Sequence, residues 1–280
     1  MDLRQLVSLC QSENDAFQYL FSKKQELKGN FCPHCGKEGF YFMGSGRLRC
    51  SNCKKDYNPF FDTSFSKLRI SSVSWLLLIK LFELEVSARK ACIQLGLSYP
   101  TTLKGFNILR CAILKELARS DNILRGEIEE DESYFGGRRK GKRGRGSENK
   151  TIVFGVLERG GRVSVSIIKD ISAETLIHET VAKVRRGSIV YTDKWKGYDS
   201  LMFCGYRHLN IDHRYKFKQG KVYINGVEGF WGFAEERLIK YHGISKNKFL
   251  LYIKEMEWRY NNRNSNLFYP LIKYMLGADN

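Results

Sequence analysis

The chain has 280 residues, of which 42% are hydrophobic and 28% are charged, so it has the composition of a folded chain with a core rather than of a disordered one. No apolar stretch approaches the roughly twenty residues that a membrane helix needs, and the amphipathic, acid-containing N-terminus is unlike a secretion signal. The 47 Lys and Arg residues exceed the 30 Asp and Glu residues and give a net charge of +17. An excess of this size points first to nucleic acid as the partner.

Two pairs of cysteines, each with two residues between its members, lie in the first part of the chain, residues 1–65. Four thiolates in two such pairs can present their sulfur atoms to one tetrahedral Zn²⁺, and the segment between the pairs has the glycine-broken aromatic alternation of a β-hairpin. The spacing therefore predicts a zinc ribbon in which the metal supplies folding energy. Four unrelated buried thiols are the alternative. The predicted zinc ligands are Cys32, Cys35, Cys50 and Cys53.

The second part, residues 66–122, is expected to be helical. Apolar residues recur at helical spacing between residues 77 and 84, and a break at residues 96–98 precedes a helix expected from about 101 to 118. A helix, a glycine-containing turn and a second helix form the layout of a helix-turn-helix, whose second helix enters the DNA major groove. A plain helical linker is the alternative. The residues expected to face DNA at the start of the second helix are Thr101, Thr102 and Lys104.

The third part, residues 123–280, shows an order of strands and helices with acids at particular points. Three extended stretches, a helix capped by Ser172, a buried strand ending at Asp193 and a helix opening near Asn225 follow one another. The three extended stretches are 127–135, 150–158 and 162–168, and the buried strand is 188–192. This order resembles the RNase H-like fold, in which three carboxylates hold two divalent ions. Other acids of the first strand, Glu127, Glu129 and Glu132, are expected to be surface charges or caps.

Four segments carry a resemblance to a known family. They are Asp131-Glu-Ser-Tyr-Phe-Gly-Gly137, Tyr191-Thr-Asp193 with Gly197-Tyr198, Asn225-Gly-Val-Glu-Gly-Phe-Trp231 and Trp258-Arg-Tyr-Asn-Asn-Arg263. With these the chain resembles, over essentially its whole length, the zinc-ribbon DDE transposases of the ISXO2-like insertion-sequence group, to which eukaryotic Merlin elements are related.

The resemblance implies an α+β multidomain protein. Its three parts would be an N-terminal zinc-ribbon DNA-binding domain at 1–65, a helix-turn-helix helical domain at 66–122 and a C-terminal RNase H-like DDE catalytic domain, a mixed β-sheet with helices, at 123–280.

The resemblance also implies the catalytic residues. Asp131 and Asp193 would be the first two ligands of a two-ion Mg²⁺ or Mn²⁺ site. Thirty-four residues separate Asp193 from Glu228, a spacing similar to that of the family, so Glu228 is the expected third ligand. Asn225, one helical turn earlier, is the alternative third ligand, and we rank it lower because a charged oxygen binds Mg²⁺ better than an amide does.

A basic stretch interrupted by glycines follows the first catalytic strand. Beside a two-metal site it is expected to clamp the DNA backbone, while a solvated loop is the alternative. Its residues are Arg138, Arg139, Lys140, Lys142, Arg143 and Arg145. Two positions depart from the family pattern: Glu235 stands where Lys is common, and Glu130 where an apolar residue is usual. Both departures are consistent with a decayed or less active copy of the transposase, which is an alternative to an active enzyme.

The function implied by the resemblance is that of a DNA transposase. It would bind the terminal inverted repeats of its own element, cleave there, and join the 3′ ends to target DNA. Its partner would be double-stranded DNA, and pairing of two ends implies a homodimer or a higher oligomer. It would act inside the cell in association with DNA, in bacterial cytoplasm or nucleoid or in a nucleus. A domesticated or decayed non-catalytic DNA-binding protein, and a structure-specific nuclease of the same fold, are the alternatives.

Overall fold

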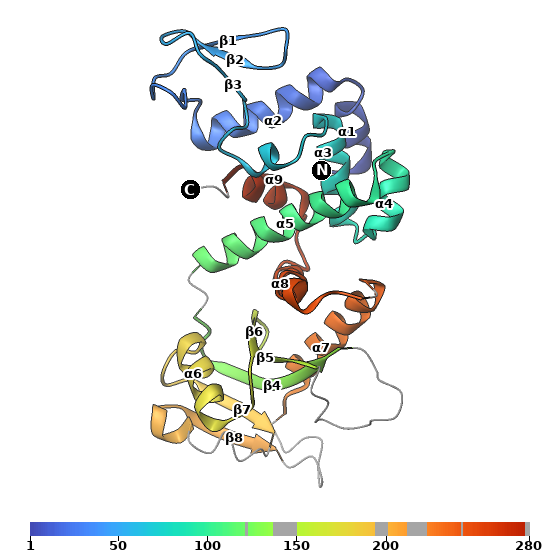
Figure 1. Ribbon diagram of the computed structural model, residues 1–280. Coiled ribbons are helices and arrows are strands. Elements are labelled where there is room, and N and C mark those ends of the chain that lie inside the picture. Colours follow the sequence, from blue (N-terminus) through green and yellow to red (C-terminus); the bar gives the residue numbers. More distant parts are fainter. Residues whose placement is uncertain (121–122, 137–149, 194–200, 212–222, 242, 278–280) are drawn as a thin grey trace. The chain divides into compact units, whose positions relative to one another are not determined.

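Figure 1 shows the protein as a computed structural model, which describes residues 1–280 except 121–122, 137–149, 194–200, 212–222, 242 and 278–280. The chain forms two compact units. Unit 1 comprises residues 1–116 and 264–280, and unit 2 comprises residues 117–263. Among the helices that the structure describes, none combines the length and the apolar character that crossing a bilayer requires.

These units differ from the three domains predicted by the sequence. The ribbon and the helical part share one unit, and residues 264–280 leave the predicted catalytic domain to join it. The elements of unit 1 are α1 (Leu3–Leu9), α2 (Glu13–Lys28), β1 (Phe40–Phe42), β2 (Leu48–Cys50), β3 (Asp56–Tyr57), η1 (Ser64–Lys67), α3 (Ser72–Glu83), α4 (Ala88–Leu95), α5 (Tyr99–Arg119) and α9 (Phe268–Gly277).

The ribbon is a three-stranded antiparallel sheet of order β1-β2-β3. The predicted hairpin is confirmed, with Phe40 opposite Cys50. The two helices before it were not predicted. Phe17 and Phe21 of α2 pack against the aromatic rings of β1, Phe40 and Phe42. The ribbon therefore rests on α2 through aromatic contacts, since its own strands are too short to enclose a core.

The helical part of unit 1 contains the predicted helix, turn and helix. Gly96, with a φ of 62°, ends α4 in the left-handed conformation that favours glycine, and α5 follows. The helix α9 packs against α2, α3 and η1. The Glu83 carboxylate at the end of α3 accepts the backbone N–H groups of Leu267 and Phe268 (3.1 and 3.0 Å), so an acid of α3 caps the start of α9.

Unit 2 is built around a five-stranded sheet of order β6-β5-β4-β7-β8. Its elements are β4 (Glu127–Phe135), β5 (Thr151–Glu158), β6 (Val163–Ile168), α6 (Ala173–Lys183), β7 (Ile189–Asp193), β8 (Arg207–Ile211), α7 (Asn225–Leu238), η3 (Ile239–Tyr241) and α8 (Lys246–Asn261). Strands β4, β5 and β6 form an antiparallel meander, and β7 and β8 continue the sheet in parallel to β4. Three antiparallel strands, a helix and two parallel strands are the RNase H-like order, so the predicted fold class is confirmed.

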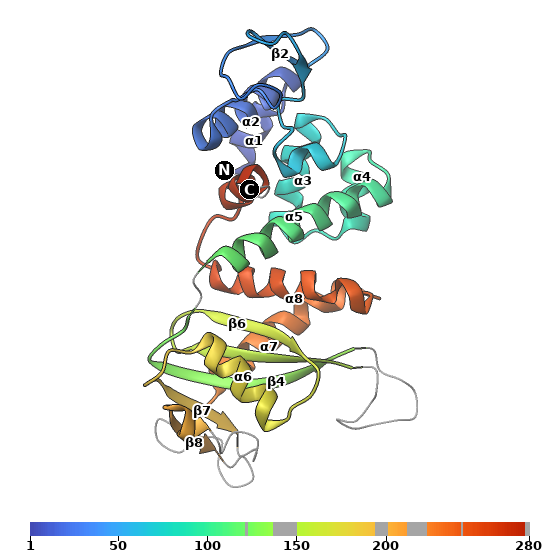
Figure 2. The same ribbon diagram turned by 60° about the vertical axis from the view of Figure 1, so that its left-hand side comes forward.

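The two faces of this sheet carry different cores. One core lies under α6, which Ser172 caps as predicted, and contains Ile128, Phe154, Val156 and Leu176. The other lies under α7 and α8 and contains Val153, Leu157, Val227 and Trp231. Figure 2 shows α6 on one face of the sheet and α7 on the other. Because side chains alternate along a strand, Glu127, Glu129 and Asp131 of β4 lie on the α7 face.

Candidate active site

The strand register brings two predicted ligands together. Strands β4 and β7 are parallel neighbours, and Glu129 lies opposite Tyr191. The ladder between these strands ends at that pair, and Asp131 and Asp193 each lie two residues further along their own strand. Side chains two residues apart on a strand share a face, so both carboxylates lie on the face of Glu129 and Tyr191, and the charge of Asp193 acts on Asp131. Asp193 is the final residue of β7, and its Oδ1 is buried and has no hydrogen-bond partner.

Asp131 is held by a side chain of α7. The indole Nε1 of Trp231 donates to Oδ2 of Asp131 at 3.0 Å. Gly155 of β5 lies directly opposite Asp131 in the sheet, and a Cβ atom there would come within 2.6 Å of the Trp231 ring. The missing side chain therefore lets the indole lie against β5 and reach Asp131.

The electrostatic surroundings of Asp131 disfavour its charged form. Burial, followed by the negative charge of Glu132, raises its pKa to about 7; the charge of Asp193 acts in the same direction, and the Trp231 hydrogen bond opposes the rise. Among the described residues, no salt bridge to Asp131 or Asp193 is recorded, and Oδ1 of Asp193 has no hydrogen-bond partner. Their hard oxygen donors fit a divalent cation such as Mg²⁺ or Mn²⁺.

The third predicted ligand lies on α7, the helix whose Trp231 contacts Asp131. Asn225 and Glu228 both stand exposed in the first turn of α7. A helix advances by about 100° per residue, so Glu228 is about 60° and Asn225 about 120° around the axis from Trp231. Since Trp231 contacts Asp131, helix geometry favours Glu228 over Asn225 as the residue beside the aspartates.

The structure does not close the three carboxylates into a single tight cluster. Within the described ranges, the four cysteines are the only group of three or more ligand residues whose donor atoms all lie within 4.8 Å of one another. Two reasons account for the separation of the three carboxylates. Like charges repel each other, and in a site for two ions about 3.5–4 Å apart the ligands of different ions need not touch.

A second layer of polar residues lies one strand repeat below the aspartates. Glu129 is 1% exposed, and its Oε2 accepts the backbone N–H groups of Gly226 and Val227 (2.7 and 3.1 Å). Its Oε1 accepts Nε of Arg159 (2.8 Å), whose Nη1 donates to Glu127 (2.7 Å). Glu129 is therefore not a surface charge: it is buried, and it accepts the first N–H groups of a helix distant in the chain.

Glu130 lies on the opposite face, in the core under α6. It is fully buried, and the hydroxyl of Thr180 donates to its Oε2 at 3.0 Å. Burial raises its pKa to about 8, against the opposing effects of the Thr180 hydrogen bond and the Lys183 charge. The departure from the family pattern at this position therefore faces away from the aspartates.

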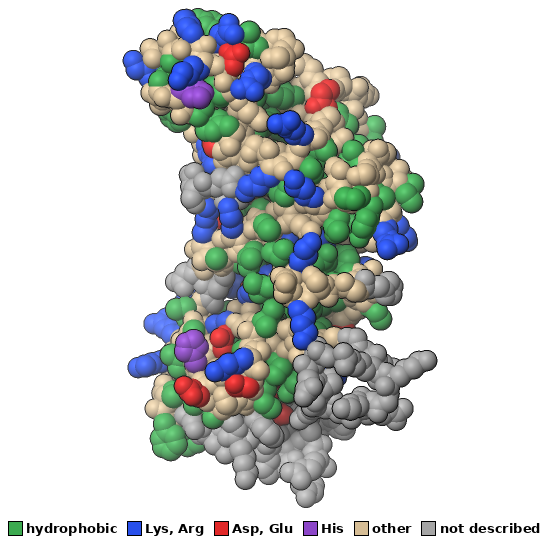
Figure 3. All heavy atoms as spheres, in the orientation of Figure 1, with side chains coloured by type: hydrophobic (Ala, Val, Ile, Leu, Met, Phe, Trp, Pro, Cys, Tyr) green, Lys and Arg blue, Asp and Glu red, His purple; other side chains and the backbone are tan. Residues whose placement is uncertain are grey.

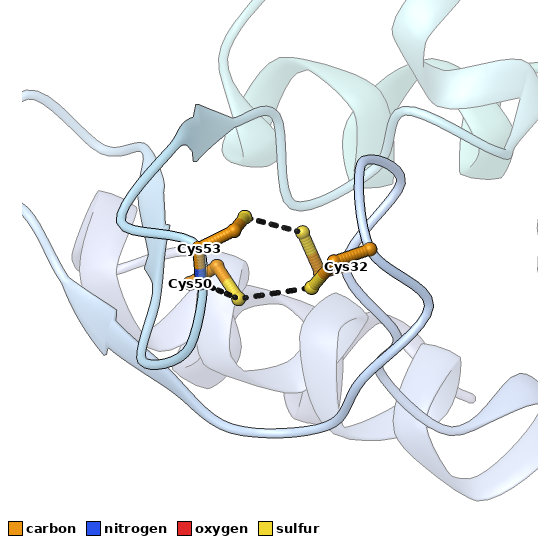
Figure 4. A group of neighbouring side chains, drawn as sticks. Cys32, Cys50 and Cys53 are labelled. Carbon is orange, nitrogen blue, oxygen red and sulfur yellow. Dashed lines mark hydrogen bonds between the residues drawn. The ribbon is translucent and has the colours of Figure 1, made fainter.

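The four predicted zinc ligands converge. The sulfur atoms of Cys32 and Cys53, and those of Cys35 and Cys50, lie 3.6 Å apart, and Figure 4 shows Cys32, Cys50 and Cys53 turned toward one another. A tetrahedron with Zn–S bonds of 2.3 Å has edges of about 3.8 Å, whereas a disulfide would require about 2.05 Å. The geometry fits a single Zn²⁺ and excludes a disulfide in this arrangement.

Both cysteine pairs fold as the same turn. The backbone N–H groups of His34 and Asn52 donate to the first sulfur of their pair, each at 3.4 Å. The residue after each pair, Gly36 or Lys54, has a left-handed φ of 70° or 60°. Hydrogen bonds from the backbone lower the pKa of the Cys50 thiol to about 6, whereas, despite a hydrogen bond from the backbone, burial and the neighbouring cysteine side chains raise that of Cys53 to about 11. The four thiols therefore share their charge unequally in the absence of metal.

The residues expected to face DNA divide into three groups. Lys104 is exposed on α5 and Thr101 is half-buried near its start. Thr102 is fully buried and its hydroxyl donates to the Ser98 carbonyl (3.2 Å), so the expectation that it faces DNA is corrected. The basic stretch from Arg138 to Arg145 lies outside the described residues.

The ribbon also carries exposed basic side chains. Figure 3 shows Lys and Arg side chains over the ribbon end of unit 1, with few acids on that face. The exposed basic residues there are Lys37, Arg47, Arg49, Lys54 and Lys55.

Three residues that build the site were not singled out by the sequence: Arg159, Gly155 and, as a helix-positioning group, Glu129. The signal for Glu129 was present, because a strand places it on the face of Asp131. No local pattern indicated Arg159 or Gly155, since their partners lie far away in the chain.

The comparisons with known proteins agree with this geometry. The family descriptions of the ISXO2-like transposase domain and the transposase zinc-ribbon domain match residues 123–261 and 11–56. An "uncharacterized transposase-like protein" of Haemophilus influenzae is 36% identical over 115 residues, covering 41% of this chain and 94% of that protein. An "uncharacterized protein in transposable element ISH50" of Halobacterium salinarum is 26% identical over 256 residues, covering 82% of this chain and 85% of that protein.

Among solved structures, the catalytic core domain of BIV integrase aligns with 52% of this chain and 93% of its own, at 13% identity and a TM-score of 0.34. The fold assignment rests on the strand order rather than on this distant likeness. The RNase H-like sheet and its acids on neighbouring strands define a class of nucleic-acid-cleaving enzymes. Within that class, the chain belongs to the ISXO2-like transposase family.

Proposed function

We propose that this protein cleaves DNA at the terminal inverted repeats of its insertion element and joins the 3′ ends to target DNA. The observation that supports this most directly is the pair formed by Asp131 and Asp193. They lie on neighbouring parallel strands, the charge of Asp193 acts on Asp131, and one Asp193 oxygen is buried without a hydrogen-bond partner. Such a pair costs free energy unless a cation or a reacting group compensates it.

The chain's own residues divide the work. Asp131, Asp193 and Glu228 hold two divalent ions, with Asn225 as the alternative to Glu228. These ions supply activation of the attacking water or 3′-hydroxyl and stabilisation of the charge at phosphorus. Trp231 orients the Asp131 carboxylate through its hydrogen bond, and the Gly155 backbone leaves room for the indole.

Unit 1 is the proposed DNA-binding unit. Its ribbon, in which Zn²⁺ has a structural role, exposes basic side chains, and Lys104 lies exposed on α5. The net charge of +17 favours double-stranded DNA as the partner. Two element ends must be brought together for joining, so we expect a homodimer or a higher oligomer on DNA.

The first experiment defines the substrate and then tests the ligands. Sequencing about a kilobase on each side of the gene should reveal terminal inverted repeats, and labelled DNA carrying them should be nicked and joined in the presence of Mg²⁺ or Mn²⁺. We expect Asp131→Asn, Asp193→Asn and Glu228→Gln to abolish cleavage while retaining DNA binding. Glu236→Gln, an exposed acid on the same helix, is the matched control and should remain active.

The outcomes separate the alternatives. If Asn225→Ala abolishes cleavage and Glu228→Gln does not, Asn225 is the third ligand. Binding of the repeats without cleavage under any divalent ion would identify a decayed or domesticated DNA-binding protein. The feature in favour of that alternative is Glu235, which replaces the Lys common in the family. Cutting of branched DNA without joining would identify a nuclease of the same fold.

A further inference from the structure

The layer below the aspartates connects the three elements that carry the proposed ligands. Glu129 belongs to β4, two residues before Asp131, and Tyr191 belongs to β7, two residues before Asp193. Both lie in register on the same face. The partners of Glu129 on the other side are the first residues of α7, which carries Glu228. One small network therefore contacts all three elements at once.

Both oxygens of Glu129 are committed. Oε2 accepts two N–H groups from the first turn of α7, where the unpaired N–H groups and the helix dipole favour a negative charge. The fit is close, because a Cβ atom on Gly226 would lie 2.7 Å from Oε2 of Glu129. Oε1 is held by Nε of Arg159 at 2.8 Å. A glutamine could not satisfy both partners, since its amide has only one acceptor atom.

Arg159 fixes this carboxylate in place. Its guanidinium carbon lies 3.7 Å from the ring centre of Tyr191 and 3.9 Å from that of Tyr223, so the group is enclosed between two aromatic faces. Its Nη2 donates to the Tyr223 carbonyl at 2.6 Å, two residues before α7 begins. The hydroxyl of Tyr191 donates to Glu127, which Arg159 also contacts.

From this geometry we infer that Glu129 is a positioning residue that fixes the start of α7, and with it Glu228, relative to Asp131 and Asp193. This inference rests on the proposed function, because it assigns the network to the same metal-binding site. Glu129 contacts the helix rather than the ions, and acts through the placement of the third ligand. Arg159 holds the Glu129 carboxylate in its orientation through the bond from Nε to Oε1.

The test uses the full-length, zinc-loaded protein and three measurements. For Glu129→Gln we expect faster backbone hydrogen exchange over residues 225–231, Mn²⁺ binding weakened about ten- to hundredfold in titration calorimetry, and a cleavage rate lowered by a similar factor, as is typical when a group that supports a metal ligand is changed. Excess Mn²⁺ should restore part of the cleavage rate. Affinity for repeat DNA should stay within about twofold, because the N-terminal region is proposed to bind it.

Ser172→Ala is the matched control. Ser172 also caps a helix of unit 2, but α6 lies on the other face of the sheet and carries no proposed ligand. It should loosen α6 without changing Mn²⁺ binding or exchange in α7. A Glu129→Gln protein with wild-type Mn²⁺ binding and wild-type exchange over 225–231 overturns the role of Glu129 alone. If wild-type protein and Asp193→Asn take up Mn²⁺ equally, the proposed function itself fails and this inference with it.

Discussion

At Gly155 the missing side chain is a structural requirement. The Cα of Gly155 lies opposite Asp131, and the Trp231 ring occupies the space into which a Cβ would project. Trp231 uses this position to donate its hydrogen bond to Asp131. One glycine thereby links sheet packing to the orientation of a carboxylate proposed to be catalytic, although its φ needs no special conformation.

We predict that Gly155→Ala destabilises the protein by about 1–3 kcal/mol, the usual cost of overpacking a core, and also lowers cleavage by displacing the indole. Urea unfolding and the cleavage assay would measure the two effects. Gly232→Ala is the control, because no atom lies within 4 Å of a Cβ there. Within α7 it should stabilise by up to about 1 kcal/mol, as alanine favours helix. Equal stability of the two variants would contradict the packing argument.

At the scale of elements, periodicity and turn signals predicted much of unit 2. The meander of β4 to β6, the cap of α6 at Ser172, the end of β7 at Asp193 and the start of α7 at Asn225 all follow the sequence pattern. These features are local, because they depend on alternation, on glycine turns and on capping side chains. Strand β8 was not predicted: its sequence RHLNI does alternate, with Leu209 and Ile211 apolar, but two apolar positions in five residues are a short signal.

Features that depend on distant partners were not predicted. Thr102 was expected on the DNA side of α5, but its position on the helix faces the interior. The helix α9 could not be assigned to a unit from its sequence. Its apolar face predicts that it is buried, but does not indicate which helices it packs against. Likewise Glu129 was expected to be a cap or a surface charge, and the helix that it caps begins almost a hundred residues later.

The placement of α9 leads to a prediction at this scale. Leu271 is fully buried on α9, so Leu271→Ala should cost about 2–5 kcal/mol. Hydrogen exchange should rise in α2 and α3, against which α9 packs, and remain unchanged in β4 to β7. Lys273→Ala, at an exposed position of the same helix, should leave both regions unaffected. Increased exchange confined to unit 2 would contradict the packing of α9 against α2 and α3.

At the scale of the whole molecule, the two units depend on different sources of stability. Unit 2 has two apolar cores on either side of its sheet. The ribbon of unit 1 has a small core in which Cys32 and Cys50 are themselves members. Metal binding there is expected to be inseparable from folding.

Removing zinc should therefore unfold the ribbon and spare unit 2. We expect a strong chelator to release Zn²⁺, to abolish protection from hydrogen exchange over residues 30–57, and to leave protection in β4 to β7 intact. Cys53→Ser should reproduce this loss, whereas Cys111→Ser, at an exposed cysteine outside the cluster, should not. Purified protein that contains no zinc, or loss of hydrogen-exchange protection in both units after chelation, would contradict the prediction that zinc stabilises the ribbon alone.

The return of residues 264–280 to unit 1 has a consequence for protein synthesis. Unit 2 is continuous in sequence and can enclose its cores as soon as residue 263 has left the ribosome, because domains generally fold as units during translation. Unit 1 must wait for α9, although most of it is made first. The nascent chain therefore completes its catalytic region before the region proposed to hold DNA. A product terminated early, anywhere within unit 2, lacks α9. The surface of α2 and α3 that α9 covers is then exposed, which makes the truncated chain a substrate for chaperones and proteases.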